Sequence, residues 1–223
     1  MMLLGQERLF SLRMDIEKLK KDFVSDGFVV VPKFLTGEEL SELERESNEA
    51  LKKNQMPDTG MGIKGLDRFH PWFFEQLRSG KHVKLLEALL EDDLEPVHAG
   101  FFDRTPGEKK GISPHIDAVG HGSSGATIWI ALDKTDTQNG CLQYAPKSHL
   151  RDYDNTLNLC FDTNPKNAFP VEINPGDAAI HNARTVHWSF ANKSKRSRRS
   201  VIYLYWAASS KSSHRKKRVK NIL

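Results

Sequence analysis

From about residue 95 onward, the apolar residues of this chain fall into short runs separated by Gly, Pro, Asn and Asp. Such runs are typical of the strands of a β-sandwich or barrel. Asn139-Gly140 and Pro175-Gly176-Asp177 add turn signals between them. The second half therefore predicts a β core whose strands lie near 97–102, 126–132, 141–144, 168–173, 178–180, 185–190 and 201–206.

The first part of the chain shows a helical period instead. Thr36-Gly37-Glu38-Glu39 is a capping box at the start of one such segment. Phe28–Val31 is a β-branched run that ends at Pro32 and predicts a strand. The glycine-rich residues 54–68 predict a loop. Apolar spacing predicts helices over about 12–24, 36–53, 71–77 and 83–90.

The 223 residues, of which 38% are hydrophobic, suit one domain with a real core. No internal repeat or linker divides the chain. We predict a mainly β fold with flanking α-helices, as a single domain over 1–208. Its helical part is about 12–93 and its β core about 95–207, and 209–223 is expected to be a basic, flexible tail.

Composition narrows the classes of function. No apolar run approaches the roughly 20 residues of a membrane span, and the start is too short for a secretory signal. With only Cys141 and Cys160, a reducing, cytoplasmic location is expected. The net charge of +4 is concentrated in 193–199 and 211–220, so the domain itself is not expected to bind nucleic acid. The basic run 215–218 leaves a nuclear location open, although such runs are more often solvated termini.

His115 and Asp117 are two good metal ligands placed two positions apart. In an extended chain, residues i and i+2 point to the same face, so both could reach one ion. Two histidines and one carboxylate are a known ligand set for non-haem Fe(II). His187, inside a predicted strand, is one candidate for the third ligand and His181 is its rival. Spacing favours His187 only modestly.

Arg198 stands at the start of the last predicted strand. An arginine there could bind a carboxylate through two parallel hydrogen bonds. The alternative is a solvated basic turn made with Arg196 and Arg199, and spacing does not decide between them. On the strand at 126–132, the aliphatic face suits burial under the helices, which turns Trp129 toward the interior of the β core, either beside a bound cosubstrate or as an ordinary core tryptophan.

The chain from about Asp26 to Trp206 resembles the phytanoyl-CoA dioxygenase family, Fe(II)/2-oxoglutarate oxygenases with a double-stranded β-helix (jelly-roll, cupin-like) core. Each shared segment is loose by itself, but their order and spacing together are specific. Lys147 departs from the glycine that is usual in one of them. The segments are 26–31 with 34–36 and 38–40, His115-Ile116-Asp117, 139–142 with 146–149, 176–177 with His181, 184–187 and Ser189, and Asn192, Ser194 and Arg198.

The resemblance implies roles for these residues. His115, Asp117 and His187 are expected to hold Fe(II), which raises His187 above His181. Arg198, Ser189 and Trp129 are expected to bind 2-oxoglutarate. O₂ is the remaining reactant, and a small organic substrate would be hydroxylated with release of succinate and CO₂.

Asp117 also favours hydroxylation over halogenation, because related halogenases have a small residue in its place. Phytanoyl-CoA itself is not the expected substrate, since the end of the chain, 221–223, is not a peroxisomal address. We expect His121, among glycines, to form a rim that contacts substrate; a plain connection between strands is the alternative.

A related non-haem iron oxidation other than hydroxylation stays open from the sequence, and so do two other classes of function. One is a catalytically silent β-helix protein that binds a ligand or partner. The other is a nucleic-acid-associated protein that uses the tail. The sequence does not indicate an oligomeric state.

Overall fold

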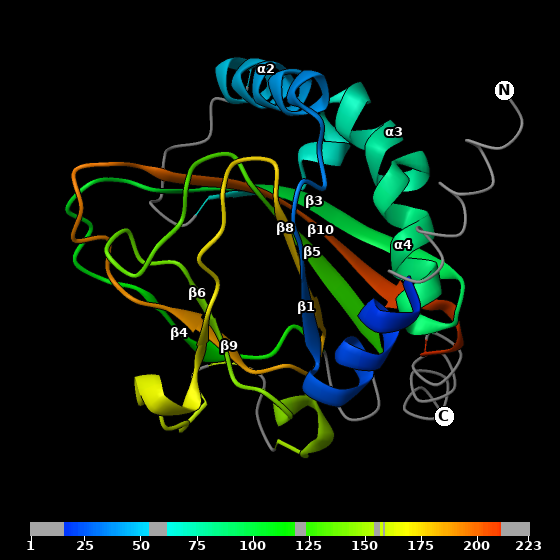
Figure 1. Ribbon diagram of the computed structural model, residues 1–223. Coiled ribbons are helices and arrows are strands. Elements are labelled where there is room, and N and C mark those ends of the chain that lie inside the picture. The colour runs from blue at the N-terminus through cyan, green and yellow to red at the C-terminus, as the bar shows by residue number, and fades with distance from the viewer. Residues whose placement is uncertain (1–15, 54–61, 119–123, 154–156, 158, 211–223) are drawn as a thin grey trace, which may run out of the picture.

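The computed structural model describes residues 16–53, 62–118, 124–153, 157 and 159–210. Its strands form two antiparallel sheets that face each other (Figure 1). The six-stranded sheet has the order β1 (Phe28–Val31), β8 (Ala178–Asn182), β5 (Gly125–Ala131), β10 (Arg198–Ala207), β3 (Leu94–Arg104) and β2 (Ile63–Lys64). The four-stranded sheet has the order β4 (Ile112–His115), β9 (His187–Ser189), β6 (Leu142–Tyr144) and β7 (Phe169–Pro170).

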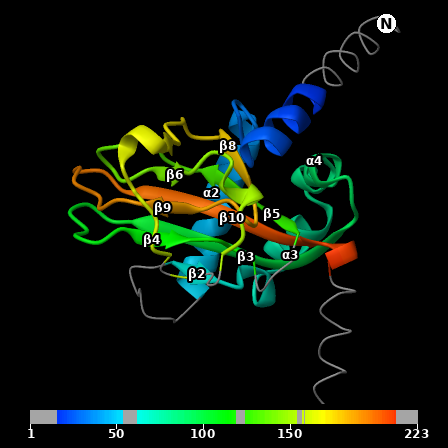
Figure 2. The same ribbon diagram turned by 90° about the horizontal axis from the view of Figure 1, so that it is seen from below.

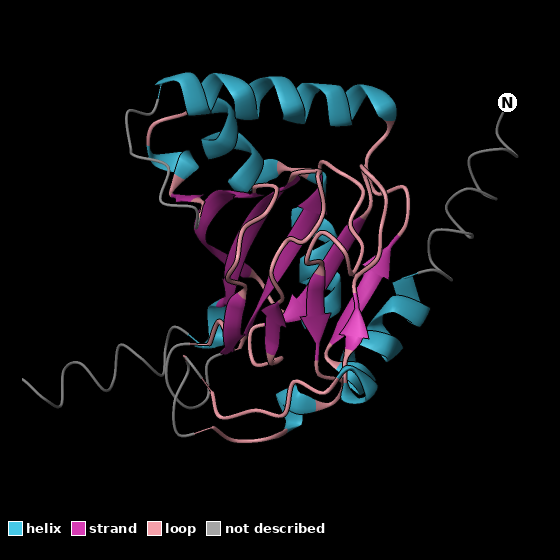
Figure 3. Ribbon diagram, turned by 90° about the vertical axis from the view of Figure 1, so that its left-hand side faces the viewer, coloured by secondary structure: helices cyan, strands magenta, loops and turns pink. Residues whose placement is uncertain are grey.

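The eight strands from β3 to β10 alternate between the two sheets, except that the consecutive strands β6 and β7 both lie in the smaller one. This alternation is the connectivity of a jelly roll, so the predicted double-stranded β-helix core is confirmed. All seven apolar runs after residue 95 contain a strand. The small sheet with β4 and β9 lies across from the large sheet with β5 and β8 (Figure 1), and Figure 3 shows the strands, in magenta, with a long helix running across one end of them.

Helices cover the outer face of the large sheet. They are a helix over 16–26, α2 (Gly37–Lys53), α3 (Pro71–Ser79) and α4 (Lys81–Leu90). Figures 1 and 2 both place α4 beside β5 and β3, away from β4 and β6. Leu43, Phe73 and Leu86 of these helices share one buried core with Ile128 and Ile130. Each such side chain contributes about 1.5–3 kcal/mol through its burial.

The strand β5 has the two faces that its sequence predicts. Ile128 and Ile130 lie under the helices, whereas Trp129 and Ala131 lie between the sheets with Tyr144. The interior of the sandwich therefore receives the odd-numbered positions of β5, and the helices receive the even-numbered ones.

Two short strands differ from the sequence prediction. Within 54–68, predicted as a loop, the structure has β2 and the 3₁₀ helix η1 (Leu66–Arg68). They are tied to β3, because Ala99 donates its N–H to Asp67 Oδ1 (2.9 Å) and accepts the N–H of Gly65 (2.8 Å). β4 contains Pro114 and no apolar alternation, which fits its place at the edge of the small sheet.

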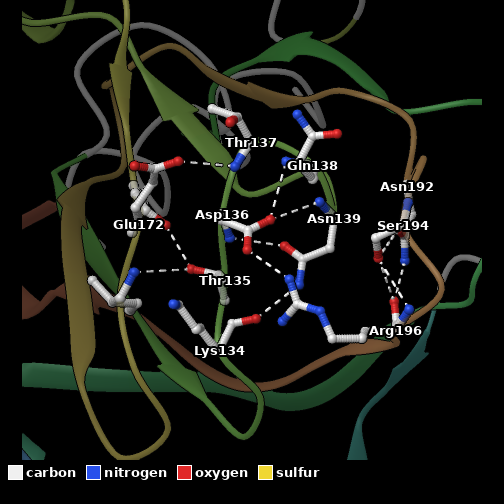
Figure 4. Close-up of polar contacts among 12 residues, drawn as sticks. Lys134, Thr135, Asp136, Thr137, Gln138, Asn139, Glu172, Asn192, Ser194 and Arg196 are labelled. Atoms are coloured by element: carbon white, nitrogen blue, oxygen red, sulfur yellow. Dashed lines mark hydrogen bonds and ion pairs between the residues drawn. The ribbon is translucent and has the colours of Figure 1, made fainter.

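The turn at Asn139-Gly140 leads into β6 (Figure 4). Asp136 Oδ1 accepts the N–H groups of Gln138 and Asn139, both at 3.0 Å. Arg196 donates to the other oxygen of Asp136 at 2.6 Å. Gly140 has φ 72°, and a side chain there would strike the Phe190 carbonyl. The predicted turn thus fixes where β6 enters the sandwich.

The remaining 3₁₀ helices are η2 (Ser148–Leu150) and η3 (Pro165–Asn167). Lys147, directly before η2, has φ 64°, a backbone conformation that favours glycine. Within the described residues, no helix is both long and apolar enough to cross a membrane.

Candidate metal centre

His115 and His187 form a directly opposed pair on the neighbouring strands β4 and β9. Their ring centroids are 4.0 Å apart. Asp117 follows β4 by two residues, and its Oδ1 lies 3.8 Å from His187 Nε2. One ligand atom from each of the three lies within 4.8 Å of the others. The structure therefore brings together the three residues that the sequence singled out.

Each histidine is held in one tautomer by a backbone carbonyl two residues earlier. His115 Nδ1–H donates to the Ser113 carbonyl at 2.9 Å, and His187 Nδ1–H donates to the Thr185 carbonyl at 3.0 Å. The lone pair then sits on Nε2 of each ring. Burial first, and then the neighbouring histidine, lowers the pKa of both imidazoles to about 4. Both rings are therefore neutral at physiological pH, as metal ligands must be.

Asp117 presents one oxygen to this pair and anchors the other. Its Oδ2 accepts hydrogen bonds from Thr127 Oγ1 (2.6 Å) and His181 Nε2 (3.0 Å). Burial alone would raise the pKa of Asp117, but His187 and the His181 hydrogen bond hold it well below 3.8. The carboxylate is therefore ionised, with Oδ1 turned toward the two lone pairs.

His181, the rival third ligand, has both ring nitrogens occupied in the structure. Nε2 bonds Asp117, and Nδ1 bonds the Tyr144 hydroxyl at 2.9 Å. His181 on β8 lies directly opposite Thr127 on β5, so two cross-strand neighbours hold the same carboxylate oxygen. His181 thus supports the carboxylate instead of offering a lone pair to an ion.

Arg198 lies in the interior with 1% of its surface exposed. Its Nε and Nη1 are buried and have no hydrogen-bond partner among the described residues. Its Cζ lies 5.6 Å from the centre of the Trp129 ring, within cation–π range. Burial first, and then Arg104, lowers the pKa of Arg198 to about 10. A buried, unpaired guanidinium of this kind lacks the carboxylate that it is shaped to bind.

The burial of Arg198 contradicts the alternative of a solvated basic turn, because Arg198 and its neighbour Arg199 lie on different faces of β10. Arg199 points the other way and binds Asp133 through two hydrogen bonds of 3.0 and 2.8 Å. Ser189, two residues after His187 on β9, is buried and accepts the N–H of Ile112 at 3.2 Å. Its own O–H remains able to donate into the interior.

A second group with metal-ligand chemistry lies outside the sandwich and consists of Glu46, Glu49 and His70. Arg45 already pairs with Glu46 at 2.8 Å, and Lys53 lies 3.7 Å from Glu49. Both carboxylates are therefore compensated by cations, unlike Asp117.

Three more residues complete the comparison between the predicted site and the structure. The predicted rim residue His121 lies outside the described residues. Tyr144 and His98 were missed as members of the site. The Nε2 of His98 is buried without a partner among the described residues, and the charge of Asp117 acts on its pKa, which burial lowers. Tyr144 could have been found only from the contact between the sheets.

The structure is a jelly roll with two histidines and one carboxylate at a sheet edge and a buried arginine in its interior. This arrangement is typical of cupin-like metalloproteins with a facial site of three residues. The family model "Phytanoyl-CoA dioxygenase (PhyH)" matches residues 23–200. The chain belongs to this family, and the resemblance seen in the sequence is confirmed.

Individual relatives are distant. The chain is 26% identical over 151 residues to "Dioxygenase lolE1" of Epichloe uncinata, covering 65% of this chain and 58% of that protein. It is 32% identical over 105 residues to the "2-aminoethylphosphonate dioxygenase" of uncultured bacterium HF130_AEPn_1, covering 43% and 39%. The chain spans about half the length of the curated relatives that it matches.

Among solved structures, the chain is similar to the epimerase SnoN, crystallised with Fe³⁺, alpha ketoglutarate and nogalamycin RO. The TM-score is 0.76 at 23% identity, with 88% of this chain and 85% of that chain covered. At this identity the likeness shows the fold.

Proposed function

We propose that this protein is an Fe(II)/2-oxoglutarate-dependent oxygenase that hydroxylates a small organic substrate. One observation carries the proposal. Two neutral histidines and one ionised carboxylate converge at one end of the same interior that holds an unpaired, buried guanidinium. A metal site alone would not need Arg198, whereas a metal-bound dicarboxylate would.

The donor set fits the two groups. His115 and His187 would bind iron through Nε2, and Asp117 through Oδ1. Arg198 Nε and Nη1 would donate to the distal carboxylate of 2-oxoglutarate. Iron as cofactor and 2-oxoglutarate and O₂ as reactants agree with the family and with the ligands crystallised in SnoN.

When bound, iron and 2-oxoglutarate supply the oxidation of a C–H bond with release of succinate and CO₂. The residues of the chain bind and orient. Ser189 would add a hydrogen bond to the cosubstrate, and Trp129 would pack beside it and exclude water. Thr127 and His181 hold the unused oxygen of Asp117, so the carboxylate keeps one orientation throughout.

Hydroxylation is the finer part of the proposal. Asp117 fills the position that halogenases leave open, which supports it. The family fold also serves an epimerase, so oxidation without oxygen transfer is the second candidate reaction. Reaction in isotopically labelled O₂ separates the two, because succinate takes up one labelled atom in both cases but only hydroxylation carries the label into the oxidised substrate.

Other parts of the prediction stay proposals. They are a single domain over 1–208, a basic tail at 209–223, a rim at His121 and a cytoplasmic location. The test for the tail is deletion of 211–223, which keeps the hydrogen bond from Ser124 N–H to Ser210 Oγ and should leave oxygenase activity unchanged if function resides in the jelly roll.

The central test is anaerobic binding of Fe(II) and 2-oxoglutarate, followed by succinate formation under O₂. We expect binding of both and slow uncoupled succinate formation without substrate. Asp117→Ala and His187→Ala should abolish the Fe(II)-dependent binding of 2-oxoglutarate and the formation of succinate. Glu49→Gln is the matched control, because it removes a ligand from the other metal-like group and should change nothing. Absence of Fe(II)-dependent 2-oxoglutarate binding by the wild type would favour the silent-protein alternative.

A further inference from the structure

A continuous line of hydrogen bonds crosses the interior from the small sheet to the carboxylate of the metal centre. The Tyr144 hydroxyl is 2.9 Å from His181 Nδ1, and His181 Nε2 is 3.0 Å from Asp117 Oδ2. Tyr144 is 0% exposed and His181 2%. Because the line is buried, each polar atom in it depends on its neighbour.

Chemistry fixes the direction of each bond. An ionised carboxylate only accepts, so the hydrogen bond between His181 and Asp117 exists only in the form with a hydrogen on Nε2. In the neutral form of the imidazole the lone pair is then on Nδ1, and the Tyr144 hydroxyl donates to it. The Tyr144 hydroxyl therefore favours one of the two neutral tautomers of His181.

The other tautomer would have a different effect on the site. It would turn a lone pair of His181 toward Asp117 Oδ2, which repels it and leaves that oxygen with Thr127 alone. The His181 ring centroid lies 4.3 Å from that of His187. A lone pair on His181 Nε2 would therefore lie beside the metal ligands as a competing donor.

The local structure holds Tyr144 for this task. Tyr144 on β6 is directly opposite His187 on β9, so the side chain of Tyr144 leaves the backbone beside a proposed metal ligand. Phe28 on β1 packs against it at 4.8 Å between ring centroids. Burial raises the pKa of Tyr144 well above 10, so the hydroxyl keeps its proton.

We propose that Tyr144 is a positioning residue: it holds His181 as the Nε2–H tautomer, which keeps Asp117 Oδ1 directed at the metal and keeps His181 out of the coordination sphere. The inference deepens the proposed function, on which it rests for the identity of the site. It predicts that a hydroxyl with no hydrogen bond to any of the three proposed metal ligands controls metal affinity.

Tyr205 provides a matched control within the same chain. Its hydroxyl is 2.8 Å from Nε2 of the buried His82, and it also donates to the Leu77 carbonyl at 2.9 Å. This tyrosine–histidine pair lies on the helix side of the large sheet. Tyr205→Phe thus removes a comparable buried hydroxyl far from the metal centre.

The tautomer is read in the metal-free full-length chain from the ¹⁵N shifts of His181. We expect the Nε2–H form in the wild type and in Tyr205→Phe, and a mixture of forms in Tyr144→Phe. A His181 tautomer unchanged by Tyr144→Phe would overturn the proposal. This readout needs neither iron nor turnover.

Metal affinity is measured with Co²⁺ alone, through its visible spectrum. Loss of an outer-shell partner of a ligand weakens metal binding about 10–100-fold, and we expect about tenfold for Tyr144→Phe with an altered spectrum. Tyr205→Phe should bind as the wild type. His181→Gln, which retains an N–H donor, should bind more tightly than His181→Phe.

The double variant Tyr144→Phe/His181→Gln should bind Co²⁺ as His181→Gln does, because Tyr144 acts only through His181. A further tenfold loss in the double variant would overturn the proposal. If the wild type failed to bind Co²⁺ at a site sensitive to Asp117→Ala, the proposed function would fail, while the ¹⁵N measurement would still decide the role of Tyr144.

Discussion

Replacement of Arg198 by Met should have two opposite effects, and the structure gives the size of each. The guanidinium is buried without a hydrogen-bond partner for Nε and Nη1 among the described residues. Its pKa falls from 12.5 to about 10. A shift of about 2.5 units corresponds to about 3 kcal/mol that the folded chain loses by burying this charge. Arg198→Met should therefore stabilise the ligand-free chain, by at most about 3 kcal/mol.

The same change should remove 2-oxoglutarate binding. Each hydrogen bond between charged groups contributes about 1.5–3 kcal/mol, so loss of two weakens binding by at least about 100-fold. Urea denaturation without ligand gives the stability, and anaerobic titration of the Fe(II) form gives the affinity. In the wild type, 2-oxoglutarate at about 100 times its Kd adds about 2.7 kcal/mol of stability, which Arg198→Met should not show.

Arg199→Met is the control, one residue away on the opposite face. Arg199 pairs with Asp133 at 2.8 Å and is 33% exposed, so its loss should lower stability by at most about 1 kcal/mol and leave 2-oxoglutarate affinity unchanged. The reasoning is refuted if Arg198→Met binds 2-oxoglutarate within a few-fold of wild type. It is also refuted if Arg198→Met is less stable than the wild type without ligand.

Three further predictions concern acid, one backbone position and the carboxylate. Burial lowers the pKa of His82 from 6.5 to about 3, so the unfolded chain binds a proton at this residue more readily than the folded chain does. The stability due to neutral His82 is therefore complete above pH 6.5 and is lost as the pH falls toward 3. The loss is about 1.4 kcal/mol one pH unit below 6.5, and His82→Gln should reduce this slope in urea denaturation; an equal slope would contradict the assignment. Lys147→Gly should raise the free energy of unfolding by up to about 1 kcal/mol, because φ is 64° there, and a destabilised variant would argue against that backbone. Asp117→Ala should abolish 2-oxoglutarate turnover measured as succinate, and wild-type turnover in this variant would exclude the triad.

Local periodicity was enough to predict much of the fold. The alternation of Ile128 and Ile130 with Trp129 already separates the helix side of β5 from the interior, and the structure agrees. β2 was beyond reach because two residues carry no pattern, and its position depends on Asp67 binding the backbone of β3.

The candidate site was predictable where it depends on residues near in sequence. His115 and Asp117 share a motif, and family resemblance supplied His187. The link from Tyr144 to His181 depends on how the two sheets face each other, so no local pattern reveals it. Arg198 and Arg199 differ only in which face of β10 each occupies, and that choice follows from the register with β3.

The ligands of the candidate centre do not belong to one sheet. His115 and His187 stand on the small sheet, whereas Asp117 is tied to β5 and β8 of the large sheet through Thr127 and His181. An ion bound to all three would therefore cross-link the two sheets of the sandwich. Metal binding would then stabilise the contact between the two sheets. Amide hydrogen exchange in β4 and β9 should slow when the ion binds, whereas the exchange rates on the helix-covered face of the large sheet should not change.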